Sequence, residues 1–312
     1  MISLTSGVTS HDGTRLAVRT WGHSDGPPVV LIHGLGLSMR SWGRVPELLA
    51  GGRRVIAYDL RGHGRSAKAT TGDYALSTHA SDLGVVLEST VADDRRAVVV
   101  GSSLGGGIIL AHAHDSNGER VAGAVFAGSG GSGITFPGFP ARTLPDWSQG
   151  LLRFGWLQAL RGVATMGRWV GPVESVSNRI IRRFAFTPDA PQGAVDQVRK
   201  KFFSTRPEAL ARTTLASVSH NGILLAPYLT VPTLVLHGDR DPEVPQEEIR
   251  KLMSMLPNAK LVTFPDAGHL LAFARGDSVA EHIAGWVRHL GDVFDRPTLT
   301  SAVSDGHAFA PE

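Results

Sequence analysis

The sequence predicts an α/β protein built on a mostly parallel β-sheet. Three observations lead to this fold class. Short apolar runs typical of buried strands recur along the chain, stretches with helical spacing separate them, and glycines follow several of the runs. Strands that alternate with helices in this way pair in parallel, and helices cover both faces of their sheet.

The first predicted element is an antiparallel hairpin. Residues 2–22 alternate around the turn signal His11-Asp-Gly-Thr14. Continuous apolar strands follow at residues 29–33 and 54–60, with a helical stretch over residues 41–50 between them. The charged loop at residues 61–66 lacks the G-x-x-x-x-G-K-S/T pattern of a phosphate-binding loop, so we expect a structural role for it.

The centre of the chain is a strand that runs through a sharp turn into a helix. A helical stretch at residues 76–88 precedes the valine-rich run that begins at Val98, and Gly101-Ser-Ser-Leu-Gly105 follows that run. A G-x-S-x-G turn places its central residue at a strained elbow, where the side chain stands clear of the sheet. Ser103 occupies that position and is the candidate nucleophile, provided that a base lies within hydrogen-bond reach.

The second half of the chain returns to the sheet pattern after an interruption. Residues 121–127 form another apolar strand, and further strands are expected at 232–237 and 260–264. Helices are expected at residues 246–255 and 278–290, and residues 291–312 are polar and expected to be loose.

The interruption is helical in character and rich in apolar residues. It has no buried strand from about residue 146 to residue 221, which predicts a helical cap over the carboxyl edge of the sheet. We expect Phe136, Phe139 and Trp156 to contact the substrate, and the apolar cap residues indicate an apolar acyl or alcohol group. The apolar cap surface also leaves a homodimer open.

Composition excludes several classes of function. The chain has no cysteine, so disulfides, thiolate metal sites and a cysteine nucleophile are excluded. The formal net charge of +3 in 312 residues provides no basic surface for nucleic acid. His112 and His114 point to different sides of their helix, so we expect no metal site there. The chain shows neither a secretory signal nor a membrane span, and we expect a cytoplasmic protein.

Candidate partners for Ser103 also follow strands. Asp239 and Asp241 both lie in the loop after residues 232–237, and His269 lies just after the strand at 260–264. The order serine, acid, histidine, each at the carboxyl end of a strand, indicates a catalytic triad. The backbone N–H groups of Leu35, in the glycine-rich loop after residues 29–33, and of Leu104 are the predicted oxyanion donors. We expect His33 to hold that loop in place.

The motifs together resemble the α/β-hydrolase fold family, and the resemblance extends over roughly residues 10–290. It is similar to the capped subfamily of carboxylesterases, lactonases, meta-cleavage-product hydrolases and cofactor-free haloperoxidase-like perhydrolases. The segments that carry the resemblance are His33-Gly-Leu-Gly36, Asp59-Leu-Arg-Gly-His-Gly-Arg-Ser66, Gly101-Ser-Ser-Leu-Gly105, His237-Gly-Asp-Arg-Asp241 with Val244-Pro245, and Gly268-His269.

The resemblance implies an eight-stranded sheet and a division of the chain. The core domain would comprise residues 1–128 and 227–291, the inserted cap residues 129–226, and a flexible tail residues 292–312. In the family, the last residue of an H-G-x-x-D pattern is the acid, which selects Asp241 over Asp239. His269 would then take the proton of Ser103 while Asp241 orients the imidazole. A serine at the elbow is unlike the aspartate of the haloalkane dehalogenase and epoxide hydrolase branches.

The expected function is therefore hydrolysis of a small apolar carboxylic ester or lactone through an acyl-enzyme, with no metal and no organic cofactor. Two alternatives remain open. The same triad could serve carbon–carbon bond hydrolysis, perhydrolysis or acyl transfer, or the fold could serve as a ligand-binding receptor.

Overall fold

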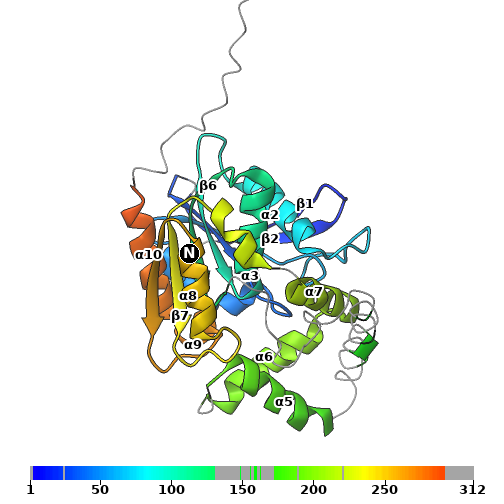
Figure 1. The fold of residues 1–312 in the computed structure, drawn as a ribbon. Coiled ribbons are helices and arrows are strands. Elements are labelled where there is room, and N and C mark those ends of the chain that lie inside the picture. The colour runs from blue at the N-terminus through cyan, green and yellow to red at the C-terminus, as the bar shows by residue number, and fades with distance from the viewer. Residues whose placement is uncertain are drawn as a thin grey trace, which may run out of the picture.

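The structure, a computed structural model, describes residues 3–23, 25–130, 172–187, 190–219 and 221–291, with a few single positions between 131 and 171. Eight strands form one sheet in the order β1-β2-β4-β3-β5-β6-β7-β8 (Figure 1). All neighbouring strands from β4 to β8 in this order are parallel, whereas β2 pairs antiparallel with both β1 and β4. The eight-stranded, mostly parallel sheet and the opening hairpin are confirmed. The strands are β1 (Ser3–Thr9), β2 (Arg15–Gly22), β3 (Pro28–Ile32), β4 (Arg54–Tyr58), β5 (Ala97–Ser102), β6 (Val121–Ala127), β7 (Thr233–Gly238) and β8 (Ala259–Phe264).

Helices join most of the parallel strands. The helix predicted at 41–50 is divided into a short 3-10 turn and α1, because the turn at Gly43 (φ 56°) interrupts it. The other predicted helices have bounds within a few residues of the expected ones. The α-helices are α1 (Val45–Leu49), α2 (Leu76–Thr90), α3 (Leu104–Ser116), α5 (Pro172–Ala185), α6 (Gln192–Ser204), α7 (Pro207–Ser219), α8 (Gln246–Met255), α9 (Leu271–Ala274) and α10 (Gly276–His289), and the 3-10 turns are η1 (Met39–Trp42), η3 (Gly222–Leu224) and η4 (Ala226–Tyr228).

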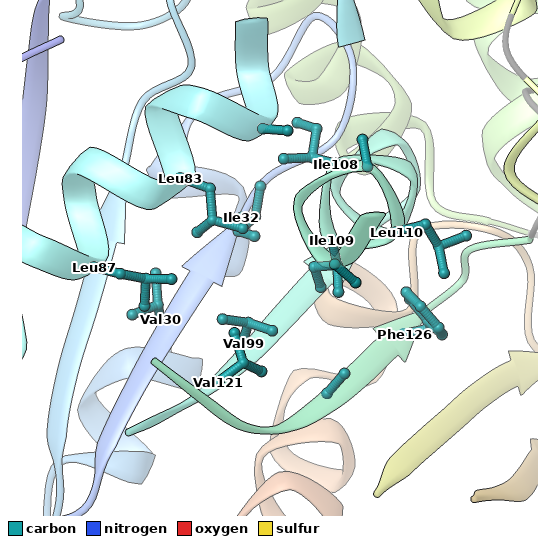
Figure 2. Close-up of a cluster of buried hydrophobic side chains, with 14 of the residues drawn as sticks. Val30, Ile32, Leu83, Leu87, Val99, Ile108, Ile109, Leu110, Val121 and Phe126 are labelled. Carbon is teal, nitrogen blue, oxygen red and sulfur yellow. The ribbon is translucent and has the colours of Figure 1, made fainter. Parts of the chain in front are cut away.

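One face of the sheet packs against α2, α3 and α8. Figure 2 shows Val30 and Ile32 of β3 with Val99 of β5 beneath Leu83 of α2 and Ile108 of α3. All five side chains are buried. Because successive strand residues point to opposite faces, the intervening residues of these strands must form a second core.

The second core lies on the other face of the sheet. Val29 and Leu31 of β3 and Val98 of β5 pack there with residues of α1 and α10, such as Leu49 and Ile283. Both faces of the central strands are therefore dry, which explains why the sequence of these strands is continuously apolar.

A buried ion-pair network fixes the charged loop after β4. Arg61 is 1% exposed and donates from Nε and Nη2 to the two carboxylate oxygens of Asp82 in α2, at 2.7 and 2.6 Å. Its Nη1 atom lies 2.9 Å from Asp12 Oδ2 in the β1–β2 turn. Arg61 therefore ties the hairpin, the loop and α2 together, in agreement with the structural role expected for this loop.

Helices α5, α6 and α7 lie together at one end of the molecule (Figure 1). Side chains from α5 and α6, including Ile181 and Val198, form an apolar cluster with Leu37 and Leu270 of the core loops. Arg206, just before α7, donates to the carbonyl oxygens of Gly62 and Ser66 at 3.1 and 2.9 Å. These contacts place the three helices over the loops that follow β3, β4 and β8.

No helix in the described part of the chain is both long and apolar enough to cross a bilayer.

Candidate active site

Ser103 lies at the elbow between β5 and α3, in a strained backbone conformation. Its φ of 53° and ψ of −119° are unusual for a residue with a side chain. The turn is closed by two glycines: a Cβ on Gly101 would lie 2.3 Å from the carbonyl carbon of Gly105, and one on Gly105 would lie 2.6 Å from Ile32 O of β3. The small residues of the motif are thus required by the close approach of α3 to the strands.

The end of β6 supports the nucleophile. Ser129 Oγ donates to the carbonyl oxygen of Ser103 at 2.6 Å, and the Ser103 N–H donates to Ala127 O at 3.4 Å. Sequence analysis assigned no role to Ser129. It lies just beyond the strand, where a short polar side chain can reach the elbow.

His269 and Asp241 form a buried pair. His269 Nδ1 lies 2.9 Å from Asp241 Oδ2 and 3.1 Å from Oδ1, and the histidine is 2% exposed. Asp241 Oδ1 also accepts the backbone N–H groups of Glu243 at 2.8 Å and Val244 at 3.0 Å. Asp239, the other aspartate of this loop, is exposed. The structure therefore brings Asp241, and not Asp239, to the histidine.

The charges of this pair stabilise each other. Burial disfavours the charged form of Asp241, but the His269 charge and the hydrogen bonds outweigh it and lower the pKa of Asp241. Burial likewise opposes the charged form of His269, yet the neighbouring carboxylates of Asp241 and Glu243 raise the pKa of His269 to about 9. An aspartate in this position fixes the Nδ1–H tautomer of the imidazole and stabilises its cation.

Glu243 is a second carboxylate at the histidine, which sequence analysis did not identify. Its Oε2 atom lies 3.0 Å from His269 Nε2, on the side of the ring opposite Asp241. Burial raises the pKa of Glu243 to about 7, although the His269 charge acts in the other direction. The available signal was its place two residues after Asp241 in the loop that follows β7.

Ser103 and His269 approach the same strand end without a mutual hydrogen bond. The Ser103 N–H contacts Ala127 O, and a Cβ on the next residue, Gly128, would lie 2.1 Å from His269 O. His269 Nε2, the atom that would accept the Ser103 proton, has no hydrogen-bond partner among the described residues. Hydrogen bonds between catalytic groups are often long or misaligned before substrate binds, so the lack of a hydrogen bond between Ser103 and His269 is compatible with a triad.

The loop after β3 lies against the nucleophile. A Cβ on Gly34 would lie 3.1 Å from Ser103 Cβ. His33 is fully buried, and its Nδ1–H donates to Gly34 O at 2.8 Å while Nε2 accepts the Leu60 N–H at 3.0 Å. Burial lowers the pKa of His33 to about 4, which keeps it neutral for both hydrogen bonds. These bonds hold the loop that carries Leu35, the predicted oxyanion donor.

An apolar pocket lies beside the elbow, between the core loops and α6. Most of its lining is hydrocarbon, with Ser102 on one side and the half-buried Lys201 on another. Its apolar lining includes Leu37, Trp42, Val198, Leu270 and Phe273. Phe136, Phe139 and Trp156, which were predicted to contact substrate, lie outside the described residues.

The described residues contain no group of three or more histidine or carboxylate side chains arranged to hold a metal ion. His112 is buried and contacts Ser116 of its own helix, whereas His114 is exposed and pairs with Asp115 at 2.8 Å. The two histidines thus have separate surroundings, as their spacing predicts.

Comparison with known proteins agrees with this geometry. The profile of the alpha/beta hydrolase fold matches residues 27–275. A non-heme haloperoxidase of Rhodococcus erythropolis is 27% identical over 298 residues, covering 90% of this chain and 98% of its own. A non-heme chloroperoxidase of Streptomyces lividans is 42% identical over 119 residues, 38% of this chain, and that match spans only 42% of the relative.

Solved structures lead to the same assignment. A thermophilic esterase from Thermogutta terrifontis superimposes with a TM-score of 0.73 and 26% sequence identity, over 92% of this chain and 99% of its own. Because the family profile covers most of the chain, from the strand β3 to the helix α9, the chain belongs to the α/β-hydrolase fold family.

Proposed function

We propose that the protein is a serine hydrolase of a small carboxylic ester or lactone that carries an apolar group. The observation that carries this proposal is the meeting of the strained elbow at Ser103 with the His269–Asp241 pair at the end of β6. Backbone strain of this kind is typical of functional sites, where it positions a reacting group.

The proposed reaction proceeds in two halves. His269 Nε2 takes the proton of Ser103 Oγ as the oxygen attacks the substrate carbonyl, and the resulting tetrahedral oxyanion is bound by the N–H groups of Leu35 and Leu104. The imidazolium then gives its proton to the departing alkoxide, leaving an acyl-enzyme. Water, deprotonated by His269, attacks this ester and returns the serine. Asp241 remains ionised throughout and stabilises the imidazolium.

The surroundings of the two proposed oxyanion donors, Leu35 and Leu104, support a hydrolase rather than a scaffold. Leu104 is the first residue of α3, so its N–H has no acceptor within the helix. The loop that carries Leu35 is held against Ser103 by the two hydrogen bonds of His33. Two N–H groups near one serine are what an oxyanion requires.

The apolar lining of the pocket beside Ser102 supports an apolar acyl or alcohol group. Its volume of about 10 Å³ is room for a single water, so such a group would enter only as the lining side chains move apart. Leu270, next to His269, and Phe273 of α9 line it on one side, and Val198 of α6 lines it on another. Burial of hydrocarbon in such a pocket contributes about 0.8 kcal/mol for each methylene group. We infer that residues 129–226 act as a cap that covers the substrate, with residues 1–128 and 227–291 as the catalytic core.

The same triad would also allow a molecule other than water to attack the acyl-enzyme. The Rhodococcus erythropolis relative, which matches across 90% of this chain, is named a non-heme haloperoxidase. If hydrogen peroxide replaced water as the attacking group, the acyl-enzyme would release a peracid. Analysis of products formed from one ester in the presence and absence of peroxide distinguishes these reactions. Carbon–carbon bond hydrolysis is tested with a dienoate as substrate, and acyl transfer by adding an alcohol as acceptor.

The test is hydrolysis of p-nitrophenyl esters of increasing acyl length. We expect turnover by the native protein and loss of most activity in Ser103→Ala and His269→Ala. Ser254→Ala, on the exposed surface of α8, is the matched control and should retain full activity. Equal activity in the native protein and the Ser103 variant would refute the proposed nucleophile. A protein that binds these compounds tightly without turnover, and that a fluorophosphonate does not label at Ser103, would instead be a receptor.

A further inference from the structure

Two carboxylates flank the imidazole of His269, one at each ring nitrogen. Asp241 lies 2.9 Å from Nδ1, and Glu243 lies 3.0 Å from Nε2. A serine-hydrolase triad needs only the first of these contacts. Nε2 is the atom that must take the Ser103 proton, and a carboxylate oxygen lies beside it instead of the serine hydroxyl.

The backbone of the loop builds this arrangement. The Glu243 N–H donates to Asp241 Oδ1 at 2.8 Å, in the turn that follows Asp241. The side chain that starts from this turn then passes around the ring to Nε2. Its carboxylate is only 14% exposed, so water replaces little of its interaction with the histidine.

Other charged groups near the ring act in the same direction or are too weak to reverse it. Glu248 of α8 is buried and its negative charge further favours the His269 cation. His237, at the end of β7, acts against that cation, but burial lowers the pKa of His237, which favours its neutral form. Among the described residues, the groups around His269 therefore carry a net negative charge, which favours the protonated imidazole.

The charge state has a chemical consequence. An imidazolium carries protons on both nitrogens and has no lone pair for a hydroxyl proton. The two carboxylates raise the pKa of His269 to about 9, against the effect of burial. Burial also raises the pKa of Glu243, so at neutral pH the His269–Glu243 pair holds one shared proton, and Nε2 is not free to accept the Ser103 proton.

We propose that Glu243 is a positioning residue that holds His269 in an inactive, protonated state with Nε2 beside its carboxylate, and that loss of the shared proton releases the histidine for catalysis. This inference rests on the proposed function, because it assigns a regulation to the same histidine. The 3.0 Å contact at Nε2 lacks the direction of a hydrogen bond, which makes it easier to exchange for Ser103.

The proton balance is simple. The resting His269–Glu243 pair holds one proton beyond the Nδ1–H that is directed to Asp241. When this proton leaves to solvent, Nε2 acquires a lone pair and Glu243 remains a carboxylate. The neutral Nε2 and the carboxylate are then both hydrogen-bond acceptors and no longer attract each other. The Glu243 side chain therefore turns away, and the Ser103 hydroxyl can donate to Nε2.

The expected result of Glu243→Gln is a gain of activity near neutral pH. Removal of the charge lowers the pH at which His269 loses its proton, so the acid limb of kcat/KM moves to lower pH by at least one unit. Below the midpoint, a displacement of one unit corresponds to about a tenfold higher kcat/KM. Glu247→Gln is the matched control: Glu247 is exposed on α8, pairs with Lys251 at 2.9 Å, and should leave the profile unchanged.

The experiment combines kinetics with a direct titration. The kcat/KM for p-nitrophenyl butyrate is measured from pH 5 to about pH 10.5, so that the range includes a His269 midpoint near 9. The proteins are the native form, Glu243→Gln, Glu243→Ala and Glu247→Gln, and the rate of spontaneous hydrolysis is subtracted at each pH. The His269 ring is titrated by NMR in the same proteins with ¹⁵N-labelled histidine, and the signal is assigned with His269→Ala. We expect both midpoints to fall in the two Glu243 variants.

The two readouts separate the possible failures. Superimposed pH profiles and equal NMR midpoints in the native and Glu243→Gln proteins would overturn the role of Glu243. If no ester is hydrolysed by any of the proteins, the proposed function fails. The NMR midpoint, together with the pH dependence of fluorophosphonate labelling at Ser103, would still decide whether Glu243 controls the histidine.

Discussion

Replacement of Gly105 by alanine tests the tight joint between the nucleophile elbow and the sheet. The Cβ of the new side chain would lie 2.6 Å from Ile32 O, a backbone atom of the buried strand β3 that cannot turn aside. Gly84 is the matched control, since it also lies in a helix and its Cβ would meet only His112, at ordinary distances of 3.6 Å from Cε1 and 3.9 Å from Nδ1. Alanine is favoured over glycine in helices at both sites, so the contact with β3 is the main difference.

The magnitudes follow from these contacts. Gly84→Ala should stabilise the protein by up to about 1 kcal/mol through helix propensity. The gain from helix propensity is similar at both sites, and overpacking in a rigid core costs about 1–3 kcal/mol. The free energy of unfolding of Gly105→Ala should therefore lie about 1–3 kcal/mol below that of Gly84→Ala. Because α3 begins directly after Ser103, a displaced helix also moves the serine and the Leu104 N–H.

Urea unfolding monitored by circular dichroism measures the stabilities, and p-nitrophenyl ester hydrolysis measures the activity. We expect Gly105→Ala to lose most activity and Gly84→Ala to keep it. If the two variants unfold at the same urea concentration and hydrolyse esters equally, the packing of α3 on β3 is looser than the 2.6 Å approach requires, and the argument for the glycine fails.

Three further predictions concern buried charge. Asp82→Ala leaves the Arg61 guanidinium without its main partner and should lower the free energy of unfolding by about 3–5 kcal/mol; a loss below 1 kcal/mol in urea unfolding would contradict the network. Burial lowers the pKa of His33 to about 4 and that of His63 to about 3, the latter with help from His33. Unfolded histidines bind protons below about pH 6.5 and these two do not, so stability is greatest above pH 6.5 and falls as the pH falls, by about 3 kcal/mol for each group at pH 4. Urea titrations at pH 7, 5.5 and 4 check this, and a constant midpoint would disprove it. Asp241→Asn should lower kcat by several orders of magnitude with little change in KM, because it removes the group that orients and charges the imidazole; an unchanged kcat in ester hydrolysis would exclude that role.

The sequence predicted the sheet well because its central strands are short, continuously apolar runs. Val29–Ile32 and Val98–Gly101 are buried on both faces, so every position is apolar and no other structure suits such short runs bounded by glycine. The helix expected at 41–50 was less well predicted. Its apolar spacing suggested one continuous helix, but Gly43 adopts a positive φ and Pro46 lies in the first turn of α1, so the helix begins only at Val45.

The residues of the candidate site could be predicted where each directly follows a strand, because the strand fixes where the residue lies in the fold. Ser103, Asp241 and His269 each follow a strand of a parallel sheet, and the carboxyl ends of these strands lie at one edge. Glu243 was not predictable in the same way, because its contact with Nε2 depends on how one loop turns and on the direction of a flexible side chain. Ser129 was missed for a similar reason: a hydrogen bond to a backbone carbonyl leaves no pattern in the sequence.

The loop that carries His269 is also held by the helices above it. The Leu270 N–H donates to Ala185 O at the end of α5 at 3.4 Å, and a Cβ on Gly268 would lie 3.1 Å from the Thr187 N atom. The residues on either side of the histidine thus contact α5 or the chain just after it. Any movement of α5 relative to the sheet would therefore change the support of His269 at the same time.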